Sequence, residues 1–578
     1  MATLAPEHAI SPDRVLLRVR FRGRSLVLTR RTALVLAAAT LVYVVSQWNA
    51  LTHEYWIMDD VRQQVYWMQR WLDPALFPGD LLSRYAQDYV PWGVQFVYYL
   101  GSFIVNPVQF TKVVALILYV AAMGFIYGFA KGLRDDFTAV AIVCVCFFFP
   151  GFMTKISGGL SQGFAYPFLA AYLYFSSTDK PRAASWTILL QSLFNPYIFT
   201  LCLATHGLYV LHRHVVPLLR DRGREHVPWV KALSALIVSN LPVIAGIALM
   251  LLKYLVMQSP EFGEIVTWKD MIGNPEYSEH GRTDDLPPPS IFWELILPWT
   301  YFFPFRNEFP ALFYGCLAAV CAGIAVAFLK RSRDIDMAGL RMFAYLLPAS
   351  IMLYAISYYA LLRLFIPNRY IEFSFTIFYA VLFGTALSAI LRRRGGVKVA
   401  SPVILIVIAL LGGLRNYNVS IYDYSHYKPL YNFIETLPKD ALIAGHPELM
   451  DNIPTFARRK AFVTYELSHP YRKRYWEQIK KRLFDLFNAY YSENSDQVRE
   501  FAANYDIDYI IVRDDDFPPH ASIHKSLYFE PFGQYIRKLF ESRRHFALMS
   551  DANFDVVFKW PGLRVVKVQK DSSRHTRR

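Results

Sequence analysis

Two adjacent carboxylates, Asp59 and Asp60, open a charged stretch that directly follows the first apolar segment. Residues 53–93 mix acidic and basic side chains with tryptophans, a combination typical of a segment that lies on a bilayer surface. A carboxylate pair at a membrane edge has three chemical uses: it caps a helix, binds a metal ion or acts as a general base. The role of this pair decides what the protein does.

A capping box is the structural alternative to catalysis. On a helix over residues 59–72, Asp60 takes the N-cap and Gln63 the third helical position, which is the spacing of a capping box. A cap uses only one carboxylate, so this interpretation leaves Asp59 to face a cavity with Arg62 and to act as the base. The local sequence does not decide between Asp59 and Asp60 as the base.

Basic residues at the predicted outer ends of apolar segments are the second chemical signal. Positively charged side chains normally collect on the cytoplasmic side, so basic residues on the outer side favour an anionic ligand such as a lipid phosphate. The alternative to phosphate binding is that these basic residues form ion pairs with nearby acids or extend toward lipid headgroups. The residues predicted to bind phosphate are Arg369, Arg363, Lys155 and Arg62. Those predicted to line the substrate cavity are Trp56, Gln63, Gln162, Asn195 and Tyr370. Arg306 and His280 are further basic residues of the second polar loop.

Composition indicates a polytopic membrane protein. The 578 residues are 54% hydrophobic and only 19% charged, and apolar runs long enough to cross a bilayer recur along the chain. The net charge of +15 gathers in short clusters at the ends of these runs, which is a topology signal and not a nucleic-acid signature. The five cysteines all fall in apolar runs, so neither a disulfide framework nor a zinc site is expected.

About eleven spans are predicted, counting a pair broken at Asn195-Pro196 as two. They cover residues 32–51, 110–130, 137–151, 163–177, 184–211 (the broken pair), 232–256, 311–330, 340–361, 370–390 and 400–414. With this number of spans, the basic loops all fall on the cytoplasmic side, as the positive-inside rule requires. Residues 1–31 are therefore expected in the cytoplasm, leading into an uncleaved signal-anchor. The polar loops 52–109 and 257–310 are expected outside.

The pattern changes after the last predicted span. Residues 32–416 form the predicted transmembrane domain, and residues 417–570 alternate short apolar strands with amphipathic helices, as a soluble α/β domain does. By parity this domain is extracytoplasmic, and residues 571–578 are expected to be a disordered tail. Strands are predicted at 441–445, 461–465, 509–512, 556–558 and 564–568, and helices at 471–491 and 496–505.

The whole plan resembles the GT-C superfamily of membrane glycosyltransferases, which includes protein O-mannosyltransferases, aminoarabinose transferases and oligosaccharyltransferases. Members carry an acidic motif in the first outer loop, and Asp59-Asp60-Val61 stands at that position here. The chain is also similar to large bacterial membrane proteins with an LFPGDL-like stretch, here Leu76–Leu81, and a late Pro-X-Arg-Tyr, here Pro367–Tyr370. It has no WWDYG-type motif, which argues against asparagine-linked transfer.

The resemblance implies an inverting sugar transfer in a bacterial inner membrane. The donor would be a polyprenyl-phosphate sugar, the acceptor an envelope glycan, lipid or protein, and the base Asp59 or Asp60. It implies no obligatory cofactor, although a divalent cation stays an alternative. Two rivals remain: a transporter or lipid flippase, which places its ionisable residues within spans, and a non-catalytic scaffold for envelope assembly.

Overall fold

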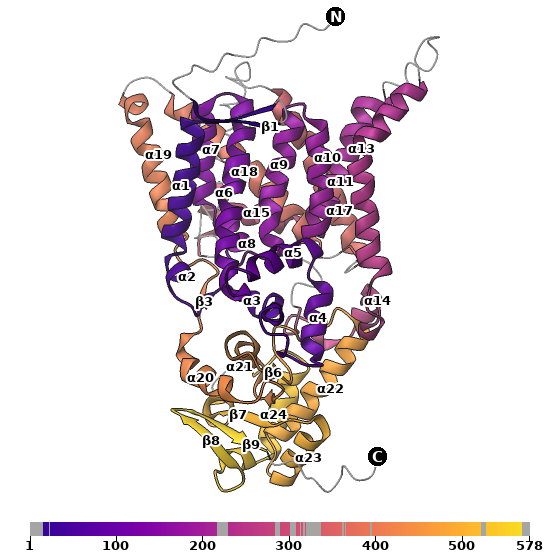
Figure 1. Cartoon of the computed structure of the whole chain (residues 1–578). Coiled ribbons are helices and arrows are strands. Elements are labelled where there is room, and N and C mark those ends of the chain that lie inside the picture. The colour runs from indigo at the N-terminus through magenta and orange to yellow at the C-terminus, as the bar shows by residue number, and fades with distance from the viewer. Residues whose placement is uncertain are drawn as a thin grey trace, which may run out of the picture.

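A computed structural model defines the fold. It describes residues 15–568 except 22–23, 217–228, 284–289, 301–307, 313, 316–317, 319–336, 361–362, 365, 393–395 and 522–526. Figure 1 shows a long helical bundle at one end of the molecule and a smaller part containing a β-sheet at the other. Most of the predicted span 311–330, together with Arg306, lies outside the described residues.

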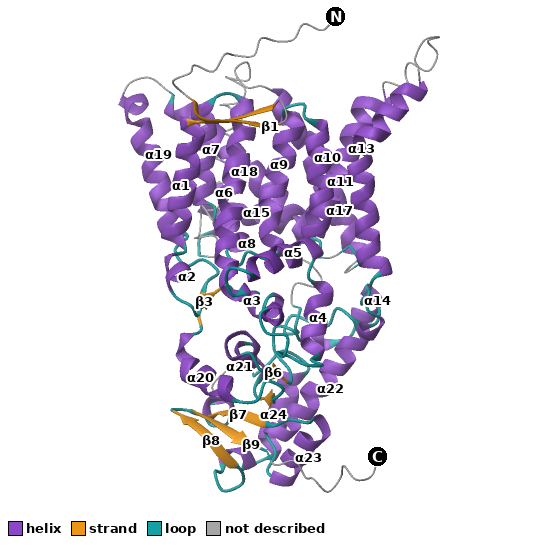
Figure 2. Cartoon of the chain, viewed as in Figure 1, coloured by secondary structure: helices purple, strands orange, loops and turns teal. Residues whose placement is uncertain are grey.

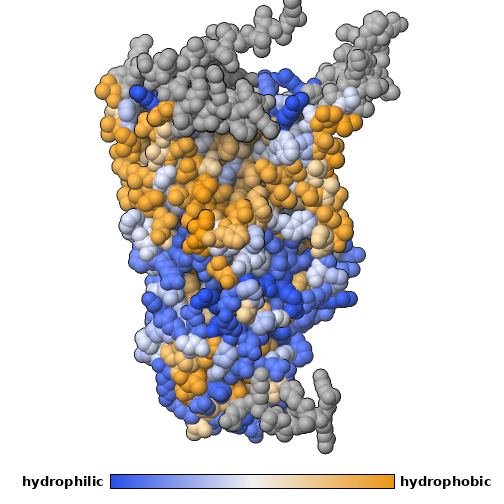
Figure 3. Space-filling view, in the orientation of Figure 1, coloured by the Kyte–Doolittle hydropathy of each residue, from blue (hydrophilic) through white to orange (hydrophobic). Residues whose placement is uncertain are grey.

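Apolar helices run side by side through the bundle. Its helices are α1 (Arg30–Ser46), α6 (Pro107–Leu133), α7 (Asp136–Phe148), α9 (Ala165–Ser177), α10 (Pro181–Phe194), α11 (Pro196–Val210), α13 (Trp229–Leu251), α15 (Ile291–Thr300), α17 (Met337–Tyr359), α18 (Asn368–Leu391) and α19 (Gly396–Arg415). On the face shown in Figure 3, hydrophobic side chains form a broad band over this part, whereas the opposite part is mostly hydrophilic.

Four helices in the described part of the chain are long and apolar enough to cross a membrane. They lie at Pro107–Leu133, Ile237–Val256, Leu340–Tyr359 and Asn368–Leu391. Helix α7 joins a short helix, α8 (Pro150–Ile156), at a bend of 67°, and this pair brings the number to five if it counts as one span. The chain is therefore a membrane protein, while the count of eleven spans and the sidedness of the loops stay predictions.

Prolines determine two breaks next to the site. A residue before proline disfavours the α conformation, and both Phe149 and Asn195 are extended directly before Pro150 and Pro196. The break predicted at Asn195-Pro196 is confirmed, because α10 ends and α11 begins there. Asn195 also caps α11, accepting a hydrogen bond from the Ile198 amide at 3.1 Å.

Short elements connect the bundle to the C-terminal part. They are α2 (Trp48–Thr52), β3 (Trp56–Ile57), α3 (Val61–Gln64), a 3-10 helix (Tyr66–Trp71), α4 (Leu81–Tyr89), α5 (Trp92–Ser102) and α14 (Trp268–Met271). Strand β3 pairs antiparallel with β4 (Tyr422–Asp423). This pairing fixes the start of the first polar loop against the chain that follows α19. At the far end of the bundle, β1 (Val15–Phe21) and β2 (Arg24–Thr29) form a hairpin.

The predicted strands of the C-terminal part form one five-stranded sheet. Its strands are β5 (Leu442–Ala444), β6 (Lys460–Ala461), β7 (Tyr509–Arg513), β8 (Asp555–Trp560) and β9 (Leu563–Lys567), in the order β6-β5-β7-β9-β8. Strands β5, β6 and β7 are parallel, and β8 and β9 are antiparallel additions (Figure 2). The helices are α20 (Lys428–Thr436), α21 (Pro447–Met450), α22 (Lys473–Tyr490), α23 (Ser495–Tyr505) and α24 (Phe532–Ser542). This part of the chain thus contains both strands and helices, while a separate soluble domain over residues 417–570 and its extracytoplasmic location stay predictions.

Candidate active site

A cavity of about 350 Å³ lies where the bundle meets the C-terminal part. Its walls come from α4, the α10–α11 break, the end of α13, the start of α18 and the segment 469–472. The polar residues that line it are Asp60, Gln63, Gln64, Asp88, Ser161, Gln162, Asn195, Lys253, Arg369, His469 and Arg472. Aromatic rings complete the walls: Tyr85, Tyr89, Tyr197, Tyr254, Phe373 and Tyr471.

Asp60 presents its carboxylate to this cavity between two amide side chains. Gln63 Nε2 donates to Asp60 Oδ1 at 2.8 Å, and Gln162 Nε2 donates to Asp60 Oδ2 at 2.9 Å. Each carboxylate oxygen can accept more than one hydrogen bond. Asp60 is therefore oriented by its two amide partners and retains lone pairs for a ligand.

The environment of Asp60 suits a general base. Burial raises the pKa of this carboxyl, and the neighbouring Asp59 charge raises it further. The Gln63 hydrogen bond and the charges of Arg369 and Lys155 act in the opposite direction on the pKa. A carboxylate with a raised pKa accepts a proton more readily, provided that it stays ionised at the working pH.

Two cations beside the cavity share a single carboxylate. Lys155 Nζ lies 2.9 Å from Glu372 Oε1, and Arg369 Nη1 lies 2.8 Å from Glu372 Oε2. Only Arg369 of this group lines the cavity. One carboxylate balances one of the two positive charges, so the group has an excess positive charge next to Asp60.

A second basic pair lies against Asp88. Lys253 Nζ donates to the Asp88 backbone oxygen at 2.7 Å, and Arg472 Nη2 lies 3.5 Å from Asp88 Oδ2. Arg472 also donates to Gln258 Oε1 at 2.7 Å. These contacts join the end of α13, α4 and the start of α22, so this pair holds the cavity walls together.

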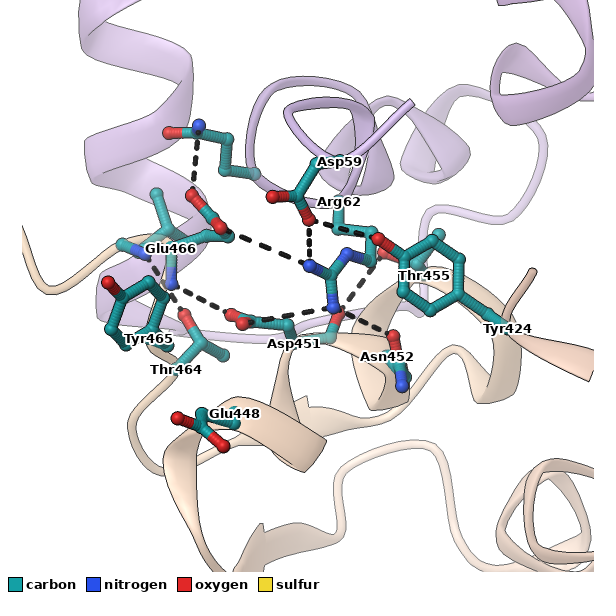
Figure 4. A network of polar contacts seen from close by, with 12 residues as sticks. Asp59, Arg62, Tyr424, Glu448, Asp451, Asn452, Thr455, Thr464, Tyr465 and Glu466 are labelled. Atoms are coloured by element: carbon teal, nitrogen blue, oxygen red, sulfur yellow. Dashed lines mark hydrogen bonds and ion pairs between the residues drawn. The ribbon is translucent and has the colours of Figure 1, made fainter. Parts of the chain in front are cut away.

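Asp59 does not line the cavity, and its carboxylate belongs to a polar network around Arg62. Its Oδ1 is held by the Arg62 guanidinium and accepts a hydrogen bond from the Tyr424 hydroxyl at 3.0 Å. Arg62 Nη1 also donates to Asn452 Oδ1 at 2.9 Å, and Figure 4 shows this guanidinium among Asp59, Asp451 and Asn452. Asp59 is thus tied to the C-terminal part.

Two predictions are therefore wrong: that Asp60 caps a helix, and that Asp59 faces the cavity as a free carboxylate. Asp60 has helical backbone angles and makes no side-chain cap; its carboxylate accepts from the Gln63 side chain instead. The predicted single helix over residues 59–72 is also wrong, because α3 ends at Gln64 and a 3-10 helix follows. The apolar stripe of Val61, Val65 and Met68 packs into the interior, which turns Asp60 to the cavity.

Of the predicted site residues, the structure brings Asp60, Gln63, Gln162, Asn195 and Arg369 together around the cavity, and their roles stay predictions. Lys155 does not line the cavity, and it pairs with Glu372, the same carboxylate that pairs with Arg369. The remaining predicted residues lie elsewhere. Arg62 is buried in the Asp59 network, Arg363 is exposed, Trp56 belongs to β3, and Tyr370 is buried with its hydroxyl on the Leu364 carbonyl at 2.9 Å.

Several residues in or next to the cavity could not be identified, or were missed, from the sequence. Glu372 had a usable signal, because it stands three residues after Arg369 on one helix, the spacing of an intrahelical ion pair. Lys253, Asp88 and Arg472 had none, since their contacts join segments far apart in the chain. His469 is half-buried in the cavity wall, and desolvation together with the Arg282 charge lowers its pKa well below the usual value, so the ring is neutral near pH 7.

Among the described residues, no group of three or more His, Cys, Asp or Glu side chains is arranged to hold a metal ion. The nearest cluster of acids, around Arg62, contains Asp59, Asp451 and Glu466, and guanidinium groups lie among them. Arg282 Nη2 adds a second cation, 3.6 Å from Glu466 Oε2. A cation in this cluster would have to displace those guanidinium groups.

Buried acids in this cluster predict a pH-dependent stability. Burial raises the pKa of Glu466 well above its usual value, and burial also raises the pKa of Asp451. Between the usual carboxyl pKa, about 4, and the raised value, the folded protein keeps a proton that the unfolded chain has released. Stability is therefore highest below the usual pKa and falls as pH rises through this window, by about 1.4 kcal/mol per pH unit for each proton.

Thermal unfolding of the detergent-solubilised protein over a pH series measures this dependence. Glu466→Gln cannot titrate, so we expect a shallower loss of stability with rising pH. Glu448→Gln is the matched control, because Glu448 is an exposed acid on α21. An unchanged slope in Glu466→Gln contradicts the assignment.

Comparison with solved structures finds membrane glycosyltransferases. ArnT from Cupriavidus metallidurans, bound to undecaprenyl phosphate, matches with a TM-score of 0.49 and 12% identity over 93% of this chain and 98% of that one. The oligosaccharyltransferase AglB from Archaeoglobus fulgidus, with an inhibitory peptide and a dolichol-phosphate, matches at 0.45 and 13% over 84% and 70%. The mycobacterial arabinofuranosyltransferase AftD matches at 0.48 and 13% over 94% and 40%.

No protein-family model and no curated protein matches the chain in sequence. These three proteins are of the class that the sequence resembles, the membrane glycosyltransferases. At TM-scores below 0.5, no residue role or substrate is carried over from them.

Proposed function

We propose that this protein is a membrane glycosyltransferase that moves a sugar from a polyprenyl-phosphate donor to an acceptor hydroxyl. One observation carries the proposal: the same cavity at the end of an apolar bundle is lined by an oriented carboxylate, Asp60, and by Arg369, which shares the Glu372 carboxylate with Lys155. A carboxylate can take the acceptor proton, and cations can bind the phosphate that leaves.

The proposed reaction is a single displacement. Asp60 removes the proton from the acceptor hydroxyl while the hydroxyl oxygen forms a bond to the anomeric carbon of the sugar. The bond between that carbon and the phosphate oxygen breaks, and the electron pair leaves with the phosphate. Arg369, supported by Lys155, balances the charge on the leaving phosphate. Attack from the face opposite the leaving group inverts the anomeric configuration.

The location of the cavity is consistent with a lipid donor. Its lining joins helices of the bundle to a segment of the C-terminal part, and on the face shown in Figure 3 the bundle is largely hydrophobic and the C-terminal part largely hydrophilic. A phosphate headgroup could therefore enter while its polyprenyl chain stays in the bilayer. The positive-inside rule supports an outer-face location for this end in a bacterial inner membrane, because the basic loops of the sequence are all predicted on the opposite, cytoplasmic side. The acceptor is then a component of the envelope.

Arg369→Gln is expected to weaken donor binding about 10- to 100-fold. Loss of one charge-assisted hydrogen bond costs about 1.5–3 kcal/mol. Lys155 still pairs with Glu372, so no buried carboxylate is left alone. The measurement is the thermal shift of the purified full chain on titration with polyprenyl phosphate. The uncharged polyprenol serves as the ligand control, and Arg363→Gln, an exposed arginine that does not line the cavity, as the variant control.

We expect stabilisation by polyprenyl phosphate, little by polyprenol, and a wild-type response in Arg363→Gln. Equal responses to the phosphate and the alcohol refute a phosphate site. A wild-type response in Arg369→Gln refutes the role of this arginine.

A further inference from the structure

The amide of Gln63 joins the candidate base to the C-terminal part of the chain. Its Nε2 donates to Asp60 Oδ1 at 2.8 Å and lies 3.3 Å from Glu466 Oε2, and its Oε1 accepts from the Tyr89 hydroxyl at 3.2 Å. An amide has two N–H donors and one carbonyl, so these three contacts use both donors and the acceptor. The orientation of Gln63 is therefore set from three directions.

Glu466 is itself held firmly. Its backbone amide donates to Asp451 Oδ1 at 2.9 Å, and its carboxyl group faces Arg282 at 3.6 Å and Arg62 at 3.9 Å. Arg282 also contacts the backbone carbonyls of Tyr465 and Glu466. Figure 4 shows Glu466 and Asp451 within one continuous network, with Glu448 outside it. The Glu466 carboxyl group is thus a fixed point for Gln63.

We infer that Glu466 is a positioning residue, which orients the Asp60 carboxylate through Gln63 and makes the C-terminal part a component of the active site. The inference rests on the proposed role of Asp60 as the base. Without Glu466, one Gln63 N–H loses its partner and the amide can rotate. Asp60 Oδ1 then loses its donor for part of the time, and the carboxylate no longer stays aligned with the acceptor.

Misalignment of a reacting group by about 1 Å costs up to a hundredfold in rate. Glu466→Leu is therefore expected to lower kcat about 10- to 100-fold, with little change in the donor KM. Glu466→Gln keeps an oxygen acceptor for Gln63, so it should recover most of the lost kcat. Glu448→Leu, an exposed acid of the same part, is the matched control and should behave as wild type.

A double-mutant cycle tests whether Glu466 acts through Gln63. In a Gln63→Leu background, Glu466→Leu should add little further loss, because the connecting amide is already gone. Equal losses in both backgrounds overturn the inference, as does a wild-type kcat in Glu466→Leu.

Carboxyl labelling with a carbodiimide, mapped by mass spectrometry, gives a readout that needs no sugar donor. Loss of a hydrogen bond to the Asp60 carboxylate favours its protonated form, which is the form that reacts. We expect Asp60 to react with the carbodiimide several-fold faster in Glu466→Leu than in Glu448→Leu. The charged residues that also act on the pKa of Asp60, namely Asp59, Arg369 and Lys155, are the same in both variants. Equal labelling rates overturn the inference, whereas a lack of turnover with every polyprenyl-phosphate sugar overturns only the proposed function.

Discussion

Asp60→Asn is expected to lower sugar transfer by at least about 100-fold while donor binding is retained. Asparagine keeps the size of the side chain and still accepts a hydrogen bond from an amide, but it cannot take a proton at neutral pH. General base catalysis contributes about 10²- to 10⁴-fold. Transfer of radiolabel from a panel of polyprenyl-phosphate sugars into envelope material measures the rate, and thermal shift with polyprenyl phosphate measures binding.

Asp59→Asn provides the matched comparison. Asp59 faces Arg62 and Tyr424, outside the cavity, so its substitution should cost stability and only a minor part of the activity. The reverse result, an active Asp60→Asn and an inactive Asp59→Asn, excludes Asp60 as the base. A wild-type protein that transfers no sugar favours the rival hypotheses of a transporter or a scaffold.

Arg62→Met is expected to cost about 3–5 kcal/mol of stability, the usual result of removing one partner from a buried ion pair. The Arg62 side chain is only 8% exposed and meets Asp59, Asp451 and Glu466. Methionine fills part of the space but leaves these acids with less positive charge. The change should appear as a lowered midpoint of thermal unfolding in detergent.

Arg84→Met is the control for this prediction. Arg84 pairs with Glu261 at 2.6 Å, but its side chain is 43% exposed, so its loss should cost at most about 1 kcal/mol. Adding Asp451→Asn to Arg62→Met should restore part of the stability, because it removes one of the acids left without a partner. Equal shifts in Arg62→Met and Arg84→Met contradict a central role for Arg62.

Local chemistry made part of the fold predictable. Proline fixed the break before Pro196, and short apolar runs indicated the strands of the C-terminal sheet. Asp60 and Arg369, both singled out by residue type and predicted position, line the cavity on different elements.

Contacts between residues far apart in the chain determined the features of the site that the sequence could not predict. Whether Asp59 or Asp60 faces the cavity depends on Arg62, which binds Asn452, 390 residues further along the chain. No local pattern contains that contact, so the helix expected over residues 59–72 put the wrong carboxylate in the cavity. The contact of Glu466 could not be predicted for the same reason, since Glu466 and Gln63 are 403 positions apart in the chain.

A structure of the Asp60→Asn variant with a polyprenyl-phosphate sugar tests the central claim most directly. The substitution blocks proton removal, so the donor should remain intact. We predict the phosphate within hydrogen-bonding distance of Arg369, about 3 Å, and the anomeric carbon of the sugar in the cavity on the side of residue 60. A donor bound elsewhere, or a phosphate that makes no contact with Arg369, would contradict the claim that this cavity is a glycosyltransferase active site.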